Sequence, residues 1–272
     1  MFKKILYNIF PWLIFIAKQK EEISAPKKIN AFINSVLSIW GFYVAVIVFL
    51  PASLYSNLQV HSKHFNFYES DSLSSKEKNK MQEIMHYLDN VIEKEPLYHD
   101  NTAVDIVDFE NRLAYMFSHP INVYSYIRYK RFPIAITIFN RVITHDLNIS
   151  NGLFYNLESI KATLHHEAIH TLQYKKYGYF HIAFMLPQWI REGYPVYRTL
   201  NESVRYNKKM IDHVLSTDQK RLTIAEKYLL WALMVKHSIE DMHISIDDLY
   251  TKNIDYDRVY HSLLKKYGKA IK

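Results

Sequence analysis

The sequence predicts an α+β fold that is mainly α, with a small mixed sheet and a transmembrane helix before it. Apolar residues recur at helical spacing through most of the second half of the chain. The stretch Pro133–Phe139 instead has isoleucines at every second position, which is typical of a strand. Ala31–Tyr55 runs for 25 residues without a charge and predicts the membrane span. With 272 residues, 49% of them hydrophobic, the chain can bury the core of one main domain.

The first 30 residues form a basic segment that carries a short apolar run, Ile5–Ala17. These 13 residues are too few to cross a bilayer, for which about 20 are needed. We therefore expect an interfacial helix here, with a second short span as the alternative. Ala31–Tyr55 is long enough to cross, and we interpret it as a retained signal anchor. Ala52 and Ser53 keep a cleaved signal peptide open as the other interpretation.

The charges around the predicted span indicate its orientation. Four lysines lie within residues 18–28, whereas Lys63 is the only Lys or Arg among residues 61–75. The positive-inside rule then predicts a single-pass protein of the cell membrane, with a cytoplasmic N-terminus and residues 61–272 outside the cytoplasm. Residues 56–75 are interpreted as a linker, so the main domain is expected to cover residues 76–272.

The first helix of this domain is predicted from Lys76 to about Glu93, after an N-cap signal in the serines before it. Residues 103–131 alternate short apolar and polar pieces and support no firm assignment. Strands are predicted at Pro133–Phe139 and at Arg141–Ile149, close to one another.

Leu164–His170 contains the pattern H-E-x-x-H inside a predicted helix. His166 and His170 stand four residues apart, so both imidazoles project from one face and can bind a single zinc ion. Glu167 lies about 100° round the helix, where it can act as a general base on a zinc-bound water without being a ligand. His165 points away from the shared face and is interpreted as a surface histidine or a support for a ligand.

The helix around this motif is predicted to begin after Asn156 as N-cap and to end at Gly178. A catalytic zinc ion needs a third protein ligand. The candidate is Glu192, which follows His170 by 22 residues. It lies on a second predicted helix that Pro187 begins.

Beyond this second helix the chain is predicted to form a C-terminal helical lobe. A strong helix is expected at Ile224–His237, and helical periodicity continues from Ser245 to about Leu264. The histidines of the lobe are interpreted as surface residues rather than ligands: His213, His237, His243 and His261.

The residues H-E-A-I-H followed by P-Q-W-I-R-E-G-Y resemble the gluzincin zinc metallopeptidases, a peptidase MA-like group that includes thermolysin-like and aminopeptidase-N-like enzymes. The resemblance covers roughly residues 133–200. It implies that His166, His170 and Glu192 are zinc ligands and that Glu167 is the general base. It also implies that a strand within Val142–Ile149 forms the edge of the sheet and binds the substrate backbone. An ordinary core strand is the alternative for that segment.

The sequence departs from the pattern of this family at a few positions. Ala168 stands where a larger apolar residue is common, and Pro195 stands where these helices usually carry Ala. Pro195 removes one backbone hydrogen bond and is expected to kink the helix after Glu192. No Asp follows Glu192 by four residues, so the group that orients a histidine ligand must come from another position.

The predicted function is that of a membrane-anchored zinc metallopeptidase that hydrolyses peptides or proteins outside the cytoplasm. Zinc would activate a water, and Glu167 would move its proton to the leaving amine. Tyr194, Tyr197 and a downstream His or Tyr are candidate donors to the oxyanion. Arg191 is a candidate partner for a substrate carboxylate.

The composition of the chain argues against thiolate metal sites and against nucleic-acid binding. Without cysteine, the chain has neither disulfides nor thiolate zinc sites. The net charge of +7 lies largely in the first 30 residues, which have six lysines and two glutamates, so nucleic acid is not an expected partner. The alternatives are a catalytically silent, zinc-stabilised, membrane-anchored binding protein, and an α-rich structural protein with a coincidental motif. No oligomeric state is predicted.

Overall fold

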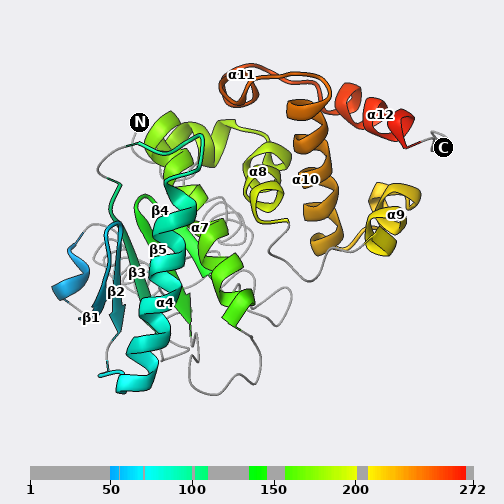
Figure 1. Cartoon of the computed structure of the whole chain (residues 1–272). Coiled ribbons are helices and arrows are strands. Elements are labelled where there is room, and N and C mark those ends of the chain that lie inside the picture. Colours follow the sequence, from blue (N-terminus) through cyan, green and yellow to red (C-terminus); the bar gives the residue numbers. More distant parts are fainter. Residues whose placement is uncertain are drawn as a thin grey trace, which may run out of the picture.

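The computed structural model of the protein describes residues 50–54, 56–69, 71–99, 102–109, 135–145, 157–200 and 208–267. Within these residues the protein is mainly helical, with a small mixed sheet of five strands, as the α+β prediction requires. In Figure 1 the sheet occupies one side of the molecule and the C-terminal helices occupy the other.

The strand order of the sheet is β1-β2-β3-β5-β4. The central strands β2, β3 and β5 are parallel, and the outer strands β1 and β4 run antiparallel to their neighbours. The prediction of two neighbouring strands after residue 133 is confirmed by β4 and β5. The strands are β1 (Asn57–His61), β2 (Phe65–Glu69), β3 (Val104–Phe109), β4 (Ala135–Ile138) and β5 (Arg141–His145).

The predicted linker at residues 56–75 is wrong, because β1 and β2 lie within it. Phe65 and Phe67 are buried and alternate with the less buried Asn66 and Tyr68, which is the period of a half-buried strand. The domain therefore begins near Asn57 and not at Lys76.

The predicted membrane segments lie almost entirely outside the described residues. This holds for Ile5–Ala17 and for most of Ala31–Tyr55; near the end of the latter, Ala52–Leu54 forms a short 3-10 helix, η1. The helices in the described part of the chain are all too short or too polar to cross a bilayer.

Two long helices cover one face of the sheet. Helix α4 (Ser75–Ile92) packs against β1, and α7 (Leu157–Tyr177) packs against β4, β5 and α4 (Figure 1). The predicted start of α4 is confirmed, because Ser74 and Glu77 form a capping box at its N-terminus. Val142 of β5 joins the core beneath these helices, whereas its neighbour Ile143 packs on the other face of the sheet.

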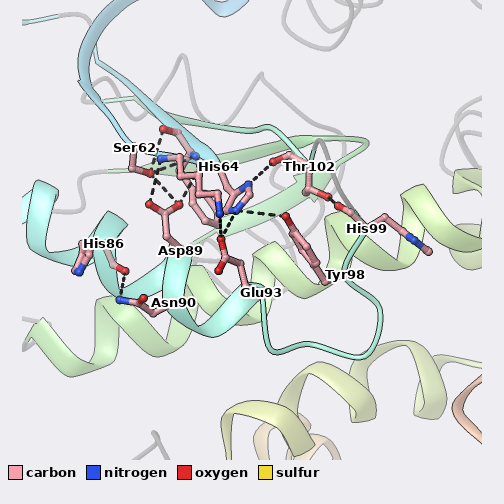
Figure 2. A network of polar contacts seen from close by, with 11 residues as sticks. Ser62, His64, His86, Asp89, Asn90, Glu93, Tyr98, His99 and Thr102 are labelled. Carbon is pink, nitrogen blue, oxygen red and sulfur yellow. Dashed lines mark hydrogen bonds and ion pairs between the residues drawn. The ribbon is translucent and has the colours of Figure 1, made fainter.

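A carboxylate on α4 holds the turn between β1 and β2 (Figure 2). Asp89 accepts hydrogen bonds from the backbone amides of Lys63 and His64, at 3.1 and 3.0 Å, and from the Ser62 hydroxyl at 3.1 Å. Because the carboxylate satisfies donors of three consecutive residues, it fixes the turn onto the helix.

The imidazole of His64 extends this network to the motif helix. Its Nε2 lies 2.9 Å from Oε1 of Glu93, and its Nδ1 lies 3.2 Å from the carbonyl of Thr102 (Figure 2). The Thr102 hydroxyl in turn accepts a hydrogen bond from Lys175 of α7 at 3.3 Å. The turn is thereby connected to both long helices.

Beyond α7 and a single π-helical turn, η2 (His181–Met185), the described chain is helical. The predicted helix at Ile224–His237 is confirmed by α10, whereas the periodicity from Ser245 to Leu264 belongs to two helices, α11 and α12. Asp255 caps α12 and separates it from α11. The helices are α8 (Gln188–Thr199), α9 (Lys208–Ser216), α10 (Ile224–Glu240), α11 (Ile246–Thr251) and α12 (Tyr256–Lys266), with a 3-10 turn, η3 (Gln219–Arg221).

One of the four histidines predicted at the surface of this lobe is buried. His237 lies between Asp241, 2.7 Å from its Nδ1, and the hydroxyl of Ser262, 2.9 Å from its Nε2. It joins α10 to α12 and so has a structural role. The other three are exposed: His213, His243 and His261.

Candidate metal centre

The H-E-x-x-H motif lies in the interior of α7, as predicted. Leu164, Ala168 and Leu172 form a buried stripe along the helix and hold it against the core. Gly178 ends the helix with a φ of +85°, a conformation that favours glycine. The predicted N-cap, Asn156, lies outside the described residues.

Glu192 reaches the motif from α8. Pro187 stands directly before this helix, and Trp189 and Ile190 bury one side of it. Gly193 brings α8 against α10, because a Cβ at this position would lie only 2.7 Å from the carbonyl oxygen of Trp231. This close contact of α8 with α10 fixes the position of the neighbouring residue, Glu192.

The three predicted ligands converge. The Nε2 atoms of His166 and His170 are 3.2 Å apart, and Oε2 of Glu192 lies 3.4 Å from His170 Nε2 and 3.9 Å from His166 Nε2. Two atoms that bind one tetrahedral zinc ion at about 2.0–2.1 Å are about 3.3–3.4 Å from each other. The nitrogen–nitrogen distance and the shorter nitrogen–oxygen distance match this edge, so the set fits a small tetrahedral ion.

The chemistry of the donor set agrees with the geometry. Two imidazoles and one carboxylate, without sulfur, are the ligands of many catalytic zinc sites. In the described part of the chain, this triad is the group of His, Asp and Glu side chains whose ligand atoms gather closely enough to hold a metal ion. It leaves a fourth position without a protein ligand.

The electrostatics of the triad are those of a neutral imidazole beside an ion pair. Burial and the charge of His170 lower the pKa of His166 to about 3, so this ring keeps a free lone pair. Burial by itself lowers the pKa of His170, but the charge and hydrogen bond of Glu192, together with Glu167 and Gln173, outweigh burial and raise it. Burial also opposes ionisation of Glu192, yet His170 and Arg191 lower its pKa to about 2.

Glu167, the predicted general base, is buried beside the triad. Thr137 of β4 donates a hydrogen bond from its hydroxyl to Oε2 of Glu167 at 2.6 Å. Burial raises the pKa of this carboxyl, while the charge of His170 and the Thr137 hydrogen bond act in the opposite direction. A carboxyl with a raised pKa beside three ligands is suited to accept and return a proton.

The strand at this edge of the sheet is β4, and the assignment of the edge to Val142–Ile149 is wrong. Strand β5, which begins at Arg141, pairs with β3 on one side and with β4 on the other, so it lies inside the sheet. The turn after Ile138 joins β4 to β5, and β4 lies on the outer side of β5, at the edge of the sheet. Thr137 therefore joins the sheet edge directly to Glu167.

The side chains that hold the ligands were not all predicted. Gln173 accepts from Nδ1 of His170 at 2.8 Å and takes the place of the missing carboxylate. Arg191, the candidate partner for a substrate carboxylate, donates from Nε to Oε1 of Glu192 at 3.0 Å. It also donates to the carbonyl of Ala183 at 2.9 Å.

Neither tyrosine predicted as an oxyanion donor is shown at the triad. The hydroxyl of Tyr197 donates to Glu240 on α10, and the buried hydroxyl of Tyr194 has no hydrogen-bond partner among the described residues. Tyr174, which the prediction missed, is nearer: its ring stacks on His170 at 6.2 Å. Burial raises its pKa, and Tyr179 and Glu192 add to that shift. Its position four residues after His170 on the same helix was the available signal.

His165 faces away from the triad, as predicted, but it is buried against a carboxylate, so the interpretation as a surface histidine is wrong. Its Nε2 lies 3.4 Å from Oε1 of Glu95, and both oxygens of Glu95 accept from Nε of Arg198, at 3.0 and 2.9 Å. This cluster ties α7 to α8 and to the segment after α4 on the side remote from the ligands.

No family model, no curated protein and no solved structure matches this chain. The likeness to gluzincins thus rests on the motif residues named above.

Proposed function

We propose that the protein is a membrane-anchored zinc metallopeptidase of gluzincin type, which hydrolyses peptide bonds outside the cytoplasm. The observation that carries the proposal is the spacing of the ligand atoms of His166, His170 and Glu192, two of whose three distances match the edge of a zinc tetrahedron. Zinc is favoured over magnesium or calcium because two of the three donors are imidazole nitrogens.

When bound, zinc would lower the pKa of a coordinated water toward about 7 and polarise the scissile carbonyl. Glu167 accepts the proton of the attacking water and delivers it to the leaving amine, so the carboxylate is restored at the end of the cycle. Thr137 orients the carboxylate through its hydrogen bond. Tyr174, beside His170, is the candidate hydroxyl for the oxyanion.

The substrate proposed is a peptide or protein segment in extended conformation. Strand β4 is an edge of the sheet, and its Thr137 reaches Glu167, so a chain added along β4 would run past the general base. Main-chain hydrogen bonds to β4 would bind the substrate without regard to most of its side chains.

The location proposed outside the cytoplasm rests on Ala31–Tyr55 and on the lysines before it. A phosphatase reporter fused after Lys272 is expected to be active only where the C-terminus is exported. An active cytoplasmic reporter at the same position would contradict this orientation.

The proposal is tested with the Glu167→Gln variant of the full-length protein. The amide cannot accept the proton of water, so we expect cleavage of a fluorogenic peptide library to fall by at least about 10²-fold, while zinc content stays unchanged. Lys161→Gln, on the same helix, is the control and should cleave as the wild type does. Undiminished cleavage by Glu167→Gln would overturn the mechanism; bound zinc without cleavage by the wild type would instead support a silent binding protein.

A further inference from the structure

We infer that Gln173 is a positioning residue for the metal centre, and that Tyr250 of the C-terminal lobe holds it in place. The inference rests on the proposed zinc centre and adds residues from outside the motif to it. Gln173 is completely buried, on the turn of α7 after His170. Tyr250, 77 residues further along the chain, comes from α11.

Both the oxygen and the nitrogen of the Gln173 carboxamide form hydrogen bonds. Its Oε1 lies 2.8 Å from Nδ1 of His170. Its Nε2 donates to the hydroxyl of Tyr250 at 2.6 Å and to the backbone carbonyl of Arg191 at 3.2 Å. One buried side chain therefore contacts a ligand on α7, the backbone beside the ligand Glu192 on α8, and the C-terminal lobe.

Pro195 explains why the Arg191 carbonyl is free to accept this bond. In an α-helix the carbonyl of residue 191 accepts from the amide of residue 195, and proline has no amide hydrogen. The helix α8 continues through Pro195 nevertheless. Gln173 supplies the donor that proline lacks, so the departure from the family pattern at Pro195 and the presence of Gln173 belong together.

This arrangement determines how the amide is oriented. A backbone carbonyl can only accept, so the nitrogen of the amide must face Arg191 and the oxygen must face His170. Oxygen at that position requires a hydrogen on Nδ1 of His170. The ring then offers the lone pair of its Nε2 to a metal ion, which is the atom that faces His166 and Glu192.

Tyr250 is well placed to keep the amide in this orientation. It is buried, its ring stacks on Tyr177 of α7 at 4.5 Å, and its backbone carbonyl lies 2.7 Å from Nε2 of His181. The stacking fixes the phenol ring, and the His181 contact fixes the backbone that carries it. The C-terminal lobe thereby reaches the metal centre through one hydrogen bond.

The test measures zinc affinity of the full-length protein by competition with a chromophoric chelator, in Gln173→Leu and Gln173→Glu. Leu removes the acceptor and both donors, and we expect zinc to bind about 10- to 100-fold more weakly. Glu removes both donors but keeps an acceptor for Nδ1, so its zinc affinity should lie between that of the wild type and that of Gln173→Leu. Thermal unfolding in EDTA should show that both variants destabilise the metal-free fold.

Tyr250→Phe and Gln82→Leu complete the series. Tyr250→Phe keeps the packed ring and loses only the hydroxyl, so a smaller loss of zinc affinity is expected. Gln82→Leu, on the exposed side of α4, is the control and should leave the zinc affinity unchanged. If the Leu and Glu variants bind zinc equally, or if affinity merely follows the unfolding temperature, the inference is overturned. A wild type that binds no zinc would overturn the proposed function, and the inference with it.

Discussion

At the scale of single residues, the protonation of Glu167 depends on its burial and on the hydroxyl of Thr137. Burial raises the pKa of Glu167, and the Thr137 hydrogen bond of 2.6 Å counteracts that rise. In Thr137→Val, which keeps the shape, the pKa should rise further, because the ionised carboxylate loses a donor. The base form exists only above this pKa, so the acidic limb of the profile of kcat/KM against pH should move to higher pH.

The size of this effect follows from the free energy that a hydrogen bond to a charged group contributes, about 1.5–3 kcal/mol. We therefore expect kcat/KM on the acidic limb to fall by about 10-fold or more in Thr137→Val. Thr137→Ser retains the hydroxyl and should keep the profile of the wild type. An unshifted profile in Thr137→Val would show that the hydroxyl does not act on the base.

The sequence predicts the ligands because their relation is local. His166, Glu167 and His170 fall within five residues of one helix, and helix geometry alone puts both imidazoles on one face. Gln173 could not be assigned in this way, because its role depends on a carbonyl that Pro195 leaves free on another helix and on a phenol from α11. The partner of a ligand is a tertiary property, and a pattern along the chain does not contain it.

At the scale of elements, the position of Glu192 depends on the close contact of α8 with α10. A Cβ on Gly193 would lie 2.7 Å from a backbone oxygen of Trp231, which cannot turn away as a side chain could. Gly193→Ala should therefore force the helices apart and lower the free energy of unfolding by about 1–3 kcal/mol. Because Glu192 moves with α8, zinc affinity should fall as well.

Gly178→Ala is the matched control for this change. Its Cβ meets nothing within 4 Å, but its φ of +85° disfavours alanine, and the expected cost is about 1–2 kcal/mol. Stability should fall in both variants, measured by denaturant unfolding, while zinc affinity should fall only in Gly193→Ala. Equal zinc affinity in the two would contradict a role for the α8–α10 contact in placing the ligand.

The turn between β1 and β2 contributes stability that depends on pH. Hydrogen bonds from Lys63, and then from His64, lower the pKa of Glu93 below its ordinary value of 4.5 (Figure 2). Because the pKa is lower in the folded state, this stabilisation is complete above about pH 4.5. It is lost as the pH falls through the folded-state pKa.

Glu93→Gln should therefore be less stable than the wild type at pH 7, and the difference should vanish toward acid pH. Denaturant unfolding at a series of pH values between 7 and the acid limit measures it. Asp71→Asn, an acid-to-amide change at an exposed position before the same helix, serves as control. A difference that stays constant through the acid range would mean that the ion pair is not the cause.

The elements also show where prediction from the sequence fails. Long helices such as α4, α7 and α10 repeat their apolar spacing over several turns, so the pattern finds them. β1 has one buried residue, Val60, and the only buried apolar residues of β2 are Phe65 and Phe67, so neither pattern stands out from a polar linker. The order β3-β5-β4 is set by pairing between distant segments and by the turn after Ile138, which explains why the wrong strand was placed at the edge.

At the scale of the whole molecule, the parts meet at the triad of the proposed metal centre. The sheet supplies Thr137, the two long helices and α8 supply the ligands and their packing, and the C-terminal lobe supplies Tyr250. These contacts from several elements hold the side chains of the triad in fixed positions, as a preorganised site requires. The proposed function therefore requires that a metal ion binds to this triad.

The most direct test is the zinc content of the purified full-length protein and of its His166→Ala and Glu192→Ala variants, measured by plasma mass spectrometry after dialysis. We predict about one zinc per chain in the wild type, because catalytic zinc requires three protein ligands. Both variants should lose the metal and remain folded by circular dichroism. A folded wild type without zinc, or undiminished zinc in either variant, would contradict the proposed metal centre.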